Sequence, residues 1–273
     1  MSSSPSTRFE GSLWHRPCVD GLTEAELPNL PLDAYMATYA ETKAMAEIAV
    51  TAACSDDFLV VNVAPHQVYG PRDNLFLPNI LEAGGTGKLR VFGDGNNRIC
   101  FTHVDNYAHA LIIAERKLYK GSPVLGKFYI ATDGATHPEP GAYCIFWREV
   151  DKAVTGMGFT SLYDKFKLPF WFIYSLALVA NGVGWLLGTT FKLNVFNVFV
   201  LTMHRWFKIS AIEKDLDYQP IIGFTEGWAD TIQWFRQNWL PTFQDSDKSL
   251  AGISRRSQAK IDIQADVAKE KAG

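Results

Sequence analysis

A tyrosine and a lysine four residues apart, Tyr39 and Lys43, are the side chains in this sequence best suited to acid–base chemistry. They stand in the run 38–53, which is rich in alanine, contains no glycine or proline, and has its apolar residues at helical spacing. On a helix, positions i and i+4 share one face. A free phenol has a pKa of about 10, and a neighbouring ammonium favours the phenolate. The pair therefore predicts a proton acceptor, although an ordinary amphipathic Tyr–Lys pair has the same spacing.

Three other motifs accompany this pair along the chain. A serine-rich run, Ser2 to Ser6, lies upstream, the motif Tyr69-Gly70-Pro71-Arg72-Asp73 lies downstream, and a glycine- and asparagine-rich turn at 92–97 leads to 101–106. In this order the motifs resemble the extended short-chain dehydrogenase/reductase superfamily. Within it they are most similar to the 3β-hydroxysteroid dehydrogenase family, in particular its sterol-4α-carboxylate 3-dehydrogenase branch. The resemblance extends from Ser2 to about Pro241.

The resemblance implies a fold, a reaction and three catalytic roles. The fold would be α/β, the C-terminal part of a Rossmann-type parallel sheet with a small, mostly helical substrate domain. The reaction would be NAD- or NADP-dependent oxidation of a 3β-hydroxyl group on a steroid or sterol. Tyr39 would take the hydroxyl proton, Lys43 would hold the nicotinamide ribose and favour the phenolate, and Ser4 would orient the substrate oxygen. Without the resemblance, a serine-rich N-terminus is typical of a disordered segment.

The segment after the predicted helix provides the expected cofactor contacts. Residues 57–64 form a short apolar run ahead of a proline, which predicts a buried parallel strand. By resemblance, Pro65, His66 and Val68 would border the nicotinamide ring. Family members commonly have arginine where this chain has Ala64. For His66, the role of an ordinary loop or core histidine fits the sequence equally well.

A glycine-rich phosphate site is expected to be absent from this sequence. A dinucleotide fold opens with a strand, a glycine-rich turn and a helix whose N-terminus receives the pyrophosphate. The run Gly84-Gly85-Thr86-Gly87 follows a predicted helix and so lacks that context. We therefore expect the chain to correspond to a truncated dehydrogenase, which puts cofactor binding by the isolated chain in doubt. NAD and NADP cannot be distinguished, because the residue that reads the ribose 2′ position belongs to the first half of the fold.

The rest of the chain divides into regular elements and three regions. Beyond the segments above, the patterns predict helices at 75–83 and 142–157 and strands at 89–92 and 127–132. A further helix is expected to begin at an N-cap residue, Asp105 or Asn106, and to end at Lys117. Residues 1–135 are expected to be a remnant of the dinucleotide-binding domain with interleaved substrate-domain segments, 136–241 a helical substrate or membrane-associated region, and 242–273 a polar, disordered tail. Arg98 is expected to be solvated, with the substrate pocket as the alternative.

An uncharged stretch lies between Lys167 and Lys192 and is followed by a second apolar run at 193–203. About 20 apolar residues suffice to cross a bilayer, and tryptophan and tyrosine near the ends suit its interface. A pair of buried helices is the alternative. The resemblance favours membrane association through 168–203, either spanning the bilayer or lying in one leaflet.

Composition excludes some classes of protein. The net charge of -3 over 273 residues gives no basic surface for nucleic acid. The four cysteines have neither metal-ligand spacing nor a disulfide pattern, which favours an intracellular setting, and no metal is expected. No secretory signal peptide is expected. With the resemblance, this predicts a membrane-associated protein of the endoplasmic reticulum, with the cytoplasm as the alternative, and allows a homodimer.

Two other functions remain open. The chain would be an extended reductase or epimerase acting on a sugar nucleotide or a flavonoid-like ketone, or a catalytically silent fragment that binds a membrane, a sterol or a partner. The apolar region 168–203 argues against a soluble sugar-nucleotide enzyme. The missing glycine-rich half favours the silent fragment.

Overall fold

The structure is a computed structural model that describes residues 19–27, 30, 32, 35, 38–189, 191 and 193–248, with the side chains of 245–248 excepted. Ser4 and the serine run lie outside the described residues, so its expected role stays a prediction.

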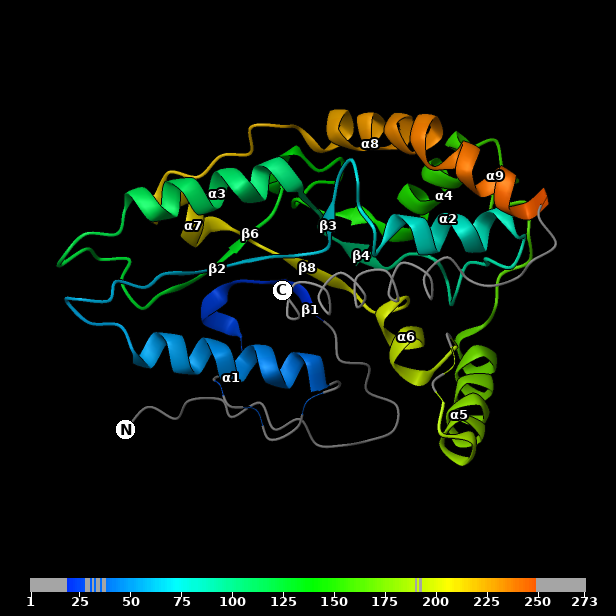
Figure 1. Cartoon of the computed structure of the whole chain (residues 1–273), viewed down its shortest axis with the longest axis horizontal. Coiled ribbons are helices and arrows are strands. Elements are labelled where there is room, and N and C mark those ends of the chain that lie inside the picture. The colour runs from blue at the N-terminus through cyan, green and yellow to red at the C-terminus, as the bar shows by residue number, and fades with distance from the viewer. Residues whose placement is uncertain are drawn as a thin grey trace, which may run out of the picture.

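Two parallel strand pairs form the framework behind the predicted catalytic helix. Strand β2 (Asn62–Pro65) pairs with β6 (Phe128–Ala131), and β3 (Val68–Tyr69) pairs with β5 (Thr102–His103). Helix α1 (Thr38–Ala52) lies on one side of β2 and β6, and other helices lie on the opposite side (Figure 1). This layering of helices on both faces of parallel strands confirms the α/β fold class.

A further four-stranded sheet has the order β1-β8-β4-β7. Its strands are β1 (Val19–Leu22), β8 (Arg205–Phe207), β4 (Arg98–Ile99) and β7 (Cys144–Ile145), and only the β4–β7 pair is antiparallel. The sheet thus takes strands from both sides of the expected boundary at 135/136. That division of the chain into domains stays a prediction.

Helices α3 (Val104–Arg116) and α7 (Ser210–Leu216) pack against β6. The short turn η1 (Glu24–Glu26) also contacts β6, and η2 (Gly134–Thr136) follows β6 along the chain. The buried side chains between α3, β6 and α7 include Tyr129, Ile212 and Tyr218. Helix α3 lies on the face of β2 and β6 opposite α1 (Figure 1).

The main hydrophobic core lies at the other end of the molecule. It is enclosed by α2 (Leu77–Gly85), α4 (Phe146–Gly156) and α8 (Phe224–Asn238), with α9 (Leu240–Lys248) packed on α8. Large aromatic side chains fill it, among them Tyr69, Phe101, Trp147, Phe224 and Trp228, all of them buried. Aromatic rings of this size bury large areas and dominate core energetics.

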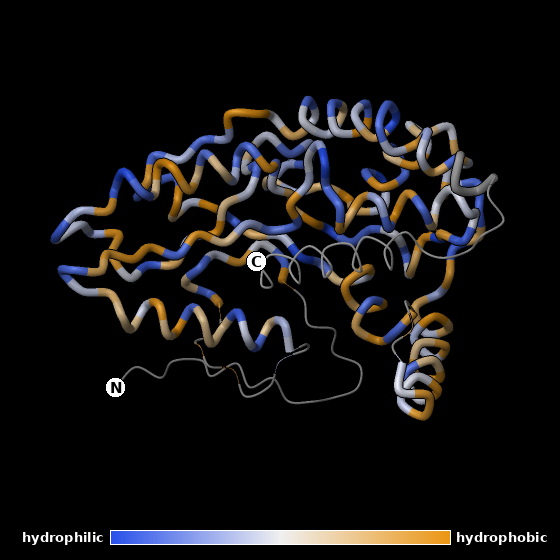
Figure 2. Tube along the Cα trace, viewed as in Figure 1, coloured by the Kyte–Doolittle hydropathy of each residue, from blue (hydrophilic) through white to orange (hydrophobic). Residues whose placement is uncertain are grey.

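Helix α5 (Phe170–Leu187) and the shorter α6 (Val195–Val200) project from the body together (Figure 1). Within the described ranges, α5 is the one helix long and apolar enough to cross a membrane, with a mean hydropathy of 1.6 and 17% of its residues buried. Figure 2 shows it as a largely hydrophobic coil at the edge of the molecule.

Four sequence expectations need correction. The expected strand at 57–64 begins only at Asn62, and 89–92 forms no strand, because Phe92 makes a single bridge to Leu168. The N-cap of α3 is His103, whose side chain accepts from the Asp105 backbone N–H, so neither Asp105 nor Asn106 caps the helix. The polar region 242–273 begins inside α9, and residues 249–273 lie outside the described part of the chain.

Candidate active site at the carboxyl end of the parallel strands

Tyr39 and Lys43 lie on the first turns of α1 and are exposed to solvent. The Tyr39 side chain is 72% exposed, and the Lys43 Nζ lies 5.8 Å from the centroid of its ring. The i, i+4 spacing thus brings the two side chains together as the sequence predicts. The ammonium lies over the ring face, so the two groups form a cation–π contact in this conformation.

The direction of α1 brings this pair toward the end of β2. Helix α1 and strand β2 run in opposite directions, so the first turn of α1 and the carboxyl end of β2 lie toward the same end of the layer (Figure 1). In open α/β sheets, ligands bind beyond the carboxyl ends of the parallel strands. Pro65 is the last residue of β2 and His66 follows it, which puts both at this edge.

Thr102 fastens His66 to the neighbouring strands. The Thr102 hydroxyl accepts a hydrogen bond from the His66 backbone N–H at 3.0 Å. Two carbonyl oxygens lie within reach as acceptors for its own proton, that of His66 at 2.7 Å and that of Ala131 at 2.8 Å. Since Pro65 pairs with Ala131, one buried hydroxyl ties the ends of β2 and β6 to β5. The backbone around His66 is therefore fixed by the sheet.

The His66 ring is held in one neutral tautomer. Its Nδ1 lies 2.8 Å from the Cys100 carbonyl oxygen, which only accepts, so Nδ1 carries the proton and Nε2 keeps its lone pair. The ring also meets Phe207 edge-on at 5.2 Å. Burial, reinforced by the charge of Arg205, lowers the pKa of His66 to about 3. His66 is thus a neutral group whose Nε2 can accept a hydrogen bond.

Arg205 is a residue of this region that the sequence did not reveal. Its Nε is buried without a hydrogen-bond partner, and no ion pair with Arg205 exists among the described residues. Burial lowers its pKa to about 10, so the guanidinium remains charged at neutral pH. Its charge acts on His66 and Cys100. The residue is partly buried, and a guanidinium with an unsatisfied buried donor is a candidate receiver for an anionic group.

Val68 lies in β3 and is partly exposed, at the rim of a cavity of about 360 Å³ formed by the loop 67–76 and Val104. Asp73 holds this loop by accepting from the backbone N–H groups of Leu75, Phe76 and Leu77. Gly70, at φ +151°, is required here because a Cβ would come within 2.7 Å of Val104 Cγ1. Val68 therefore lines this cavity, whereas His66 is not among the residues that line it.

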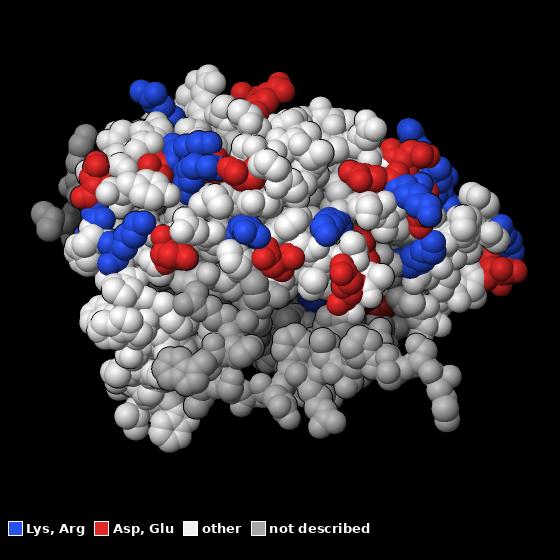
Figure 3. Space-filling model, turned by 180° about the vertical axis from the view of Figure 1, so that it is seen from behind, with Lys and Arg blue, Asp and Glu red and all other residues white. Residues whose placement is uncertain are grey.

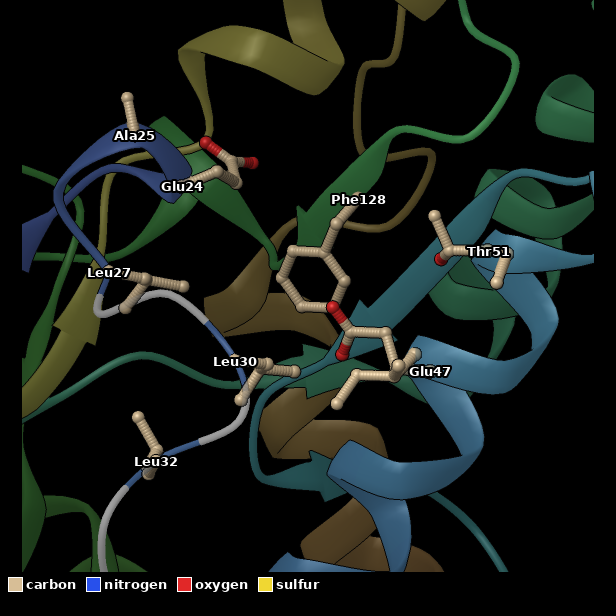
Figure 4. Close-up of a pocket in the computed structure, with 10 residues that line it drawn as sticks. Glu24, Ala25, Leu27, Leu30, Leu32, Glu47, Thr51 and Phe128 are labelled. Carbon is tan, nitrogen blue, oxygen red and sulfur yellow. The ribbon is translucent and has the colours of Figure 1, made fainter.

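A larger cavity of about 770 Å³ lies beside the second half of α1. Figure 4 shows Phe128 and Glu47 at its centre, with Leu27, Leu30 and Leu32 on the opposite wall. Burial raises the pKa of Glu47. The cavity is mostly apolar, and Thr51, which also lines it, accepts a hydrogen bond from the Asn62 side chain at 2.8 Å.

Two other sequence candidates are placed by the structure away from ligand binding. Arg98 is solvated as expected, with 40% of its side chain exposed, and it also pairs with Asp20 at 3.0 Å and lies over the Tyr143 ring. The glycine run at 84–87 ends α2, and Cβ atoms at Gly84 and Gly85 would meet Val154 and Phe243. These glycines allow close packing and do not form a phosphate-binding turn at a helix N-terminus.

Comparison with known proteins identifies the class and the family. In fold, the chain is similar to dTDP-glucose 4,6-dehydratase from Bacillus anthracis in complex with NAD (19% identity, TM-score 0.50, covering 82% of this chain and 59% of that one). It is also similar to UDP-glucose 4-epimerase from Thermotoga maritima (16% identity, TM-score 0.51, covering 81% and 59%). These likenesses show that the fold is of the Rossmann type.

The family model for the 3-beta hydroxysteroid dehydrogenase/isomerase family matches residues 15–154, just over half of the chain. The chain belongs to this family, and the resemblance noted in the sequence is confirmed.

Three curated relatives illustrate the range of the similarity. Human sterol-4-alpha-carboxylate 3-dehydrogenase, decarboxylating, is 29% identical over 244 residues, covering 86% of this chain and 61% of the relative. A 3beta-hydroxysteroid-dehydrogenase/decarboxylase of Arabidopsis thaliana is 30% identical over 239 residues, covering 86% and 40%. The 2-alkyl-3-oxoalkanoate reductase of Stenotrophomonas maltophilia is 29% identical over 221 residues, covering 79% and 63%. The chain thus spans between 40% and 63% of the length of these relatives.

Proposed function

We propose that this chain carries the catalytic helix and C-terminal half of an NAD- or NADP-dependent 3β-hydroxysteroid dehydrogenase that oxidises a sterol. One observation carries the proposal: Tyr39 and Lys43 lie exposed and in contact on α1, toward the end of the layer where β2 ends at Pro65 and His66. Membership of the family and the sterol dehydrogenases among the relatives support the substrate class.

The proposed mechanism assigns proton transfer to Tyr39. The Tyr39 oxygen would accept the proton of the 3β-hydroxyl group, with the Lys43 ammonium held over the face of the same ring. Ser4 would hold the substrate oxygen in line. A nicotinamide cofactor, when bound, supplies the acceptor for the hydride from C3.

The residues present fit the nicotinamide end of such a cofactor. Lys43 offers exposed donors for the ribose hydroxyls, and Pro65, His66 and Val68 would border the ring, with His66 Nε2 as an acceptor. The described residues contain no glycine-rich turn at a helix N-terminus for the phosphates, since the run 84–87 ends a helix. We infer that phosphate binding depends on residues other than these.

We further infer that Arg205 favours a sterol that carries a carboxylate. The human relative is named for a sterol-4-alpha-carboxylate. An unpaired guanidinium beside His66 would gain a charge-assisted hydrogen bond from such a group. In Arg205→Met, kcat/KM for a sterol-4α-carboxylate should fall about 100-fold, while kcat/KM for the neutral 3β-hydroxysterol should change little. Equal losses on both substrates would contradict this role.

Because a sterol substrate dissolves in lipid, we propose that the protein works at the membrane of the endoplasmic reticulum. Helices α5 and α6 would contact that membrane. The exposed apolar surface of α5 supports this proposal. A homodimer is compatible with it.

The second candidate is a catalytically silent fragment that binds a membrane, a sterol or a partner. The wide exposure of Tyr39 favours it, because no wall of described residues closes over the tyrosine. Catalysis would require such closure to exclude water from the reacting atoms.

The test is hydride transfer by the chain in detergent, followed as NADH or NADPH formation with a sterol-4α-carboxylate. We expect activity that Tyr39→Phe lowers at least about 100-fold and Tyr119→Phe, a change at another exposed tyrosine, leaves intact. A nicotinamide fluorescence titration separates binding from chemistry. If the wild-type chain neither binds the cofactor nor oxidises sterol, the silent fragment is correct.

A further inference from the structure

Helix α5 presents a wide apolar face to solvent. Its exposed large side chains include Phe172, Leu176, Val179, Val183 and Leu186, which recur every three to four residues and so line one side of the helix. Trp171, Leu178 and Trp185 extend this face, and Trp185 is 81% exposed. In Figure 3, the described residues of the lobe at the lower left, where the rotated view places α5, show neither acidic nor basic side chains. Apolar patches of this kind mark interaction sites.

Both ends of this apolar segment are fastened to the same folded body. At its start, the Leu168 N–H donates to the Val91 carbonyl oxygen and the Gly93 N–H donates to the Leu168 carbonyl oxygen, each at 2.9 Å. At its end, the Trp147 indole N–H donates to the Leu201 carbonyl oxygen at 3.2 Å. Two ends held on one body cannot lie on opposite sides of a bilayer.

The chain reverses at the tip of α5. Gly188 adopts a left-handed conformation, and the Thr189 N–H donates to the Gly184 carbonyl oxygen at 2.9 Å. A Cβ on Gly184 would lie 3.5 Å from the Phe191 ring, so the returning chain runs close along the helix.

Helix α6 then packs back on the first half of α5. Val198 is buried against Ile173 and Ala177, and the Phe199 ring lies 5.7 Å from the ring of Tyr174. The two helices and the turn between them therefore form a hairpin, whose ends meet near Leu168 and Leu201.

The base of the hairpin combines aromatic and basic side chains. Tyr163, Phe166 and Trp171 are exposed there, Lys167 lies 5.9 Å from the centroid of the Tyr163 ring, and Arg90 lies 5.1 Å from that of Phe166. Lys165 is partly exposed in the same loop, where Asp164 is the one acidic residue. Aromatic rings prefer the headgroup level of a bilayer, and lysine and arginine are attracted to anionic lipid.

We propose that α5, its turn and α6 insert into a single leaflet as a re-entrant hairpin, with Lys165, Lys167 and Arg90 meeting the headgroups of anionic phospholipids. This inference rests on the proposed work at a membrane and specifies its topology and lipid class. A helix of 18 residues is about 27 Å long, whereas one leaflet of hydrocarbon is about 15 Å thick. The hairpin must therefore lie tilted in the leaflet.

The first experiment is flotation of the purified chain with vesicles of phosphatidylcholine alone or mixed with phosphatidylserine. We expect binding to both, and binding at least about tenfold tighter when phosphatidylserine is present. Leu178→Asp should weaken binding about 100-fold, whereas Ile112→Asp, on α3 and equally exposed (52% against 50%), should not. Equal binding of both variants, or no preference for the anionic lipid, would overturn the proposal.

The second experiment measures topology. Leu187→Cys, at the tip of α5, is labelled with a fluorophore in a chain whose other cysteines are replaced, and the chain is added to sealed vesicles. Quenchers attached to lipid chains should quench the label, and an impermeant quencher trapped inside the vesicles should not. Quenching from inside would mean that the segment spans the bilayer. If the protein is a dimer in the absence of vesicles and the label is shielded from solvent there, a second copy of the chain covers α5.

These readouts are independent of catalysis. Tyr39→Phe should float as the wild-type chain does even when hydride transfer is lost. Loss of flotation with activity retained would overturn the hairpin and leave the proposed reaction standing.

Discussion

The Tyr69 hydroxyl donates a hydrogen bond to Asp133 Oδ2 at 2.9 Å, and both side chains are fully buried. Asp133 Oδ1 accepts from the His103 backbone N–H at 2.8 Å and from the Asn106 side chain at 2.7 Å. The Asn106 oxygen in turn accepts from the backbone N–H groups of residues 221 and 222, just before α8. One buried carboxyl group thus joins the end of β6, the start of α3 and the approach to α8.

We expect Tyr69→Phe to lower the free energy of unfolding by about 1–3 kcal/mol, because the change leaves a buried carboxylate oxygen without its partner. Urea unfolding followed by tryptophan fluorescence measures it. Tyr119→Phe, at an exposed tyrosine, is the control and should change stability little. Equal midpoints for the two variants would show that the Tyr69 hydroxyl contributes nothing.

Asp133 should make stability depend on pH. Burial raises its pKa from 3.8 to about 6 despite three hydrogen bonds to the carboxylate. The pKa of Asp133 is higher in the folded state than in the unfolded state. The contribution of its protonated form to the free energy of unfolding is therefore fully present below about pH 3.8 and is lost as the pH rises through about 6. The loss at neutral pH is on the order of 3 kcal/mol.

The measurement is urea unfolding of wild type and Asp133→Asn between pH 4 and pH 8. The asparagine keeps an acceptor for the His103 N–H, and its amide can donate to the Tyr69 oxygen. The free energy of unfolding of Asp133→Asn should therefore increase relative to that of the wild type as the pH rises. A difference that does not vary with pH would contradict the raised pKa of Asp133.

His66 should remain neutral throughout the physiological range. Its folded-state pKa of about 3 lies below the unfolded value of about 6.5. Its contribution to stability is therefore present above about pH 6.5 and is lost as the pH falls toward 3. Nitrogen NMR should show a proton on Nδ1 from pH 5 to pH 8. Arg205→Met should raise the pKa of His66, because the arginine charge contributes to lowering it. Titration of His66 near pH 6.5 in the wild type would contradict this picture.

Two helical glycines should respond oppositely to alanine. At Gly227 in α8, a Cβ would lie 2.9 Å from the Tyr69 hydroxyl oxygen and from His103 Cδ2, so Gly227→Ala should destabilise the fold by about 1–3 kcal/mol. At Gly182 in α5, a Cβ meets nothing within 4 Å, so Gly182→Ala should stabilise the helix by up to about 1 kcal/mol. Thermal unfolding compares the two, and destabilisation by both would mean that helix propensity does not decide the effect at Gly182.

The sequence by itself determined the features that depend on local patterns. The alanine-rich run without glycine or proline specified α1 and the Tyr39–Lys43 pair, and the uncharged stretch specified α5. The motifs around Tyr69 and 92–106 carried the resemblance that identified the family. These signals can be read from the chain because helix periodicity and motif order involve residues close in sequence.

Tertiary structure decided what depends on residues far apart in the chain. His103 caps α3 where the pattern favoured Asp105 or Asn106, because the backbone at His103 is extended by its pairing with β3. Arg98 is held by Asp20, 78 residues away, and Arg205 lies unpaired beside His66. The contacts that fasten Leu168 and Leu201 to one body turned an apolar segment into a hairpin. Such contacts follow from packing and strand order, which no local pattern encodes.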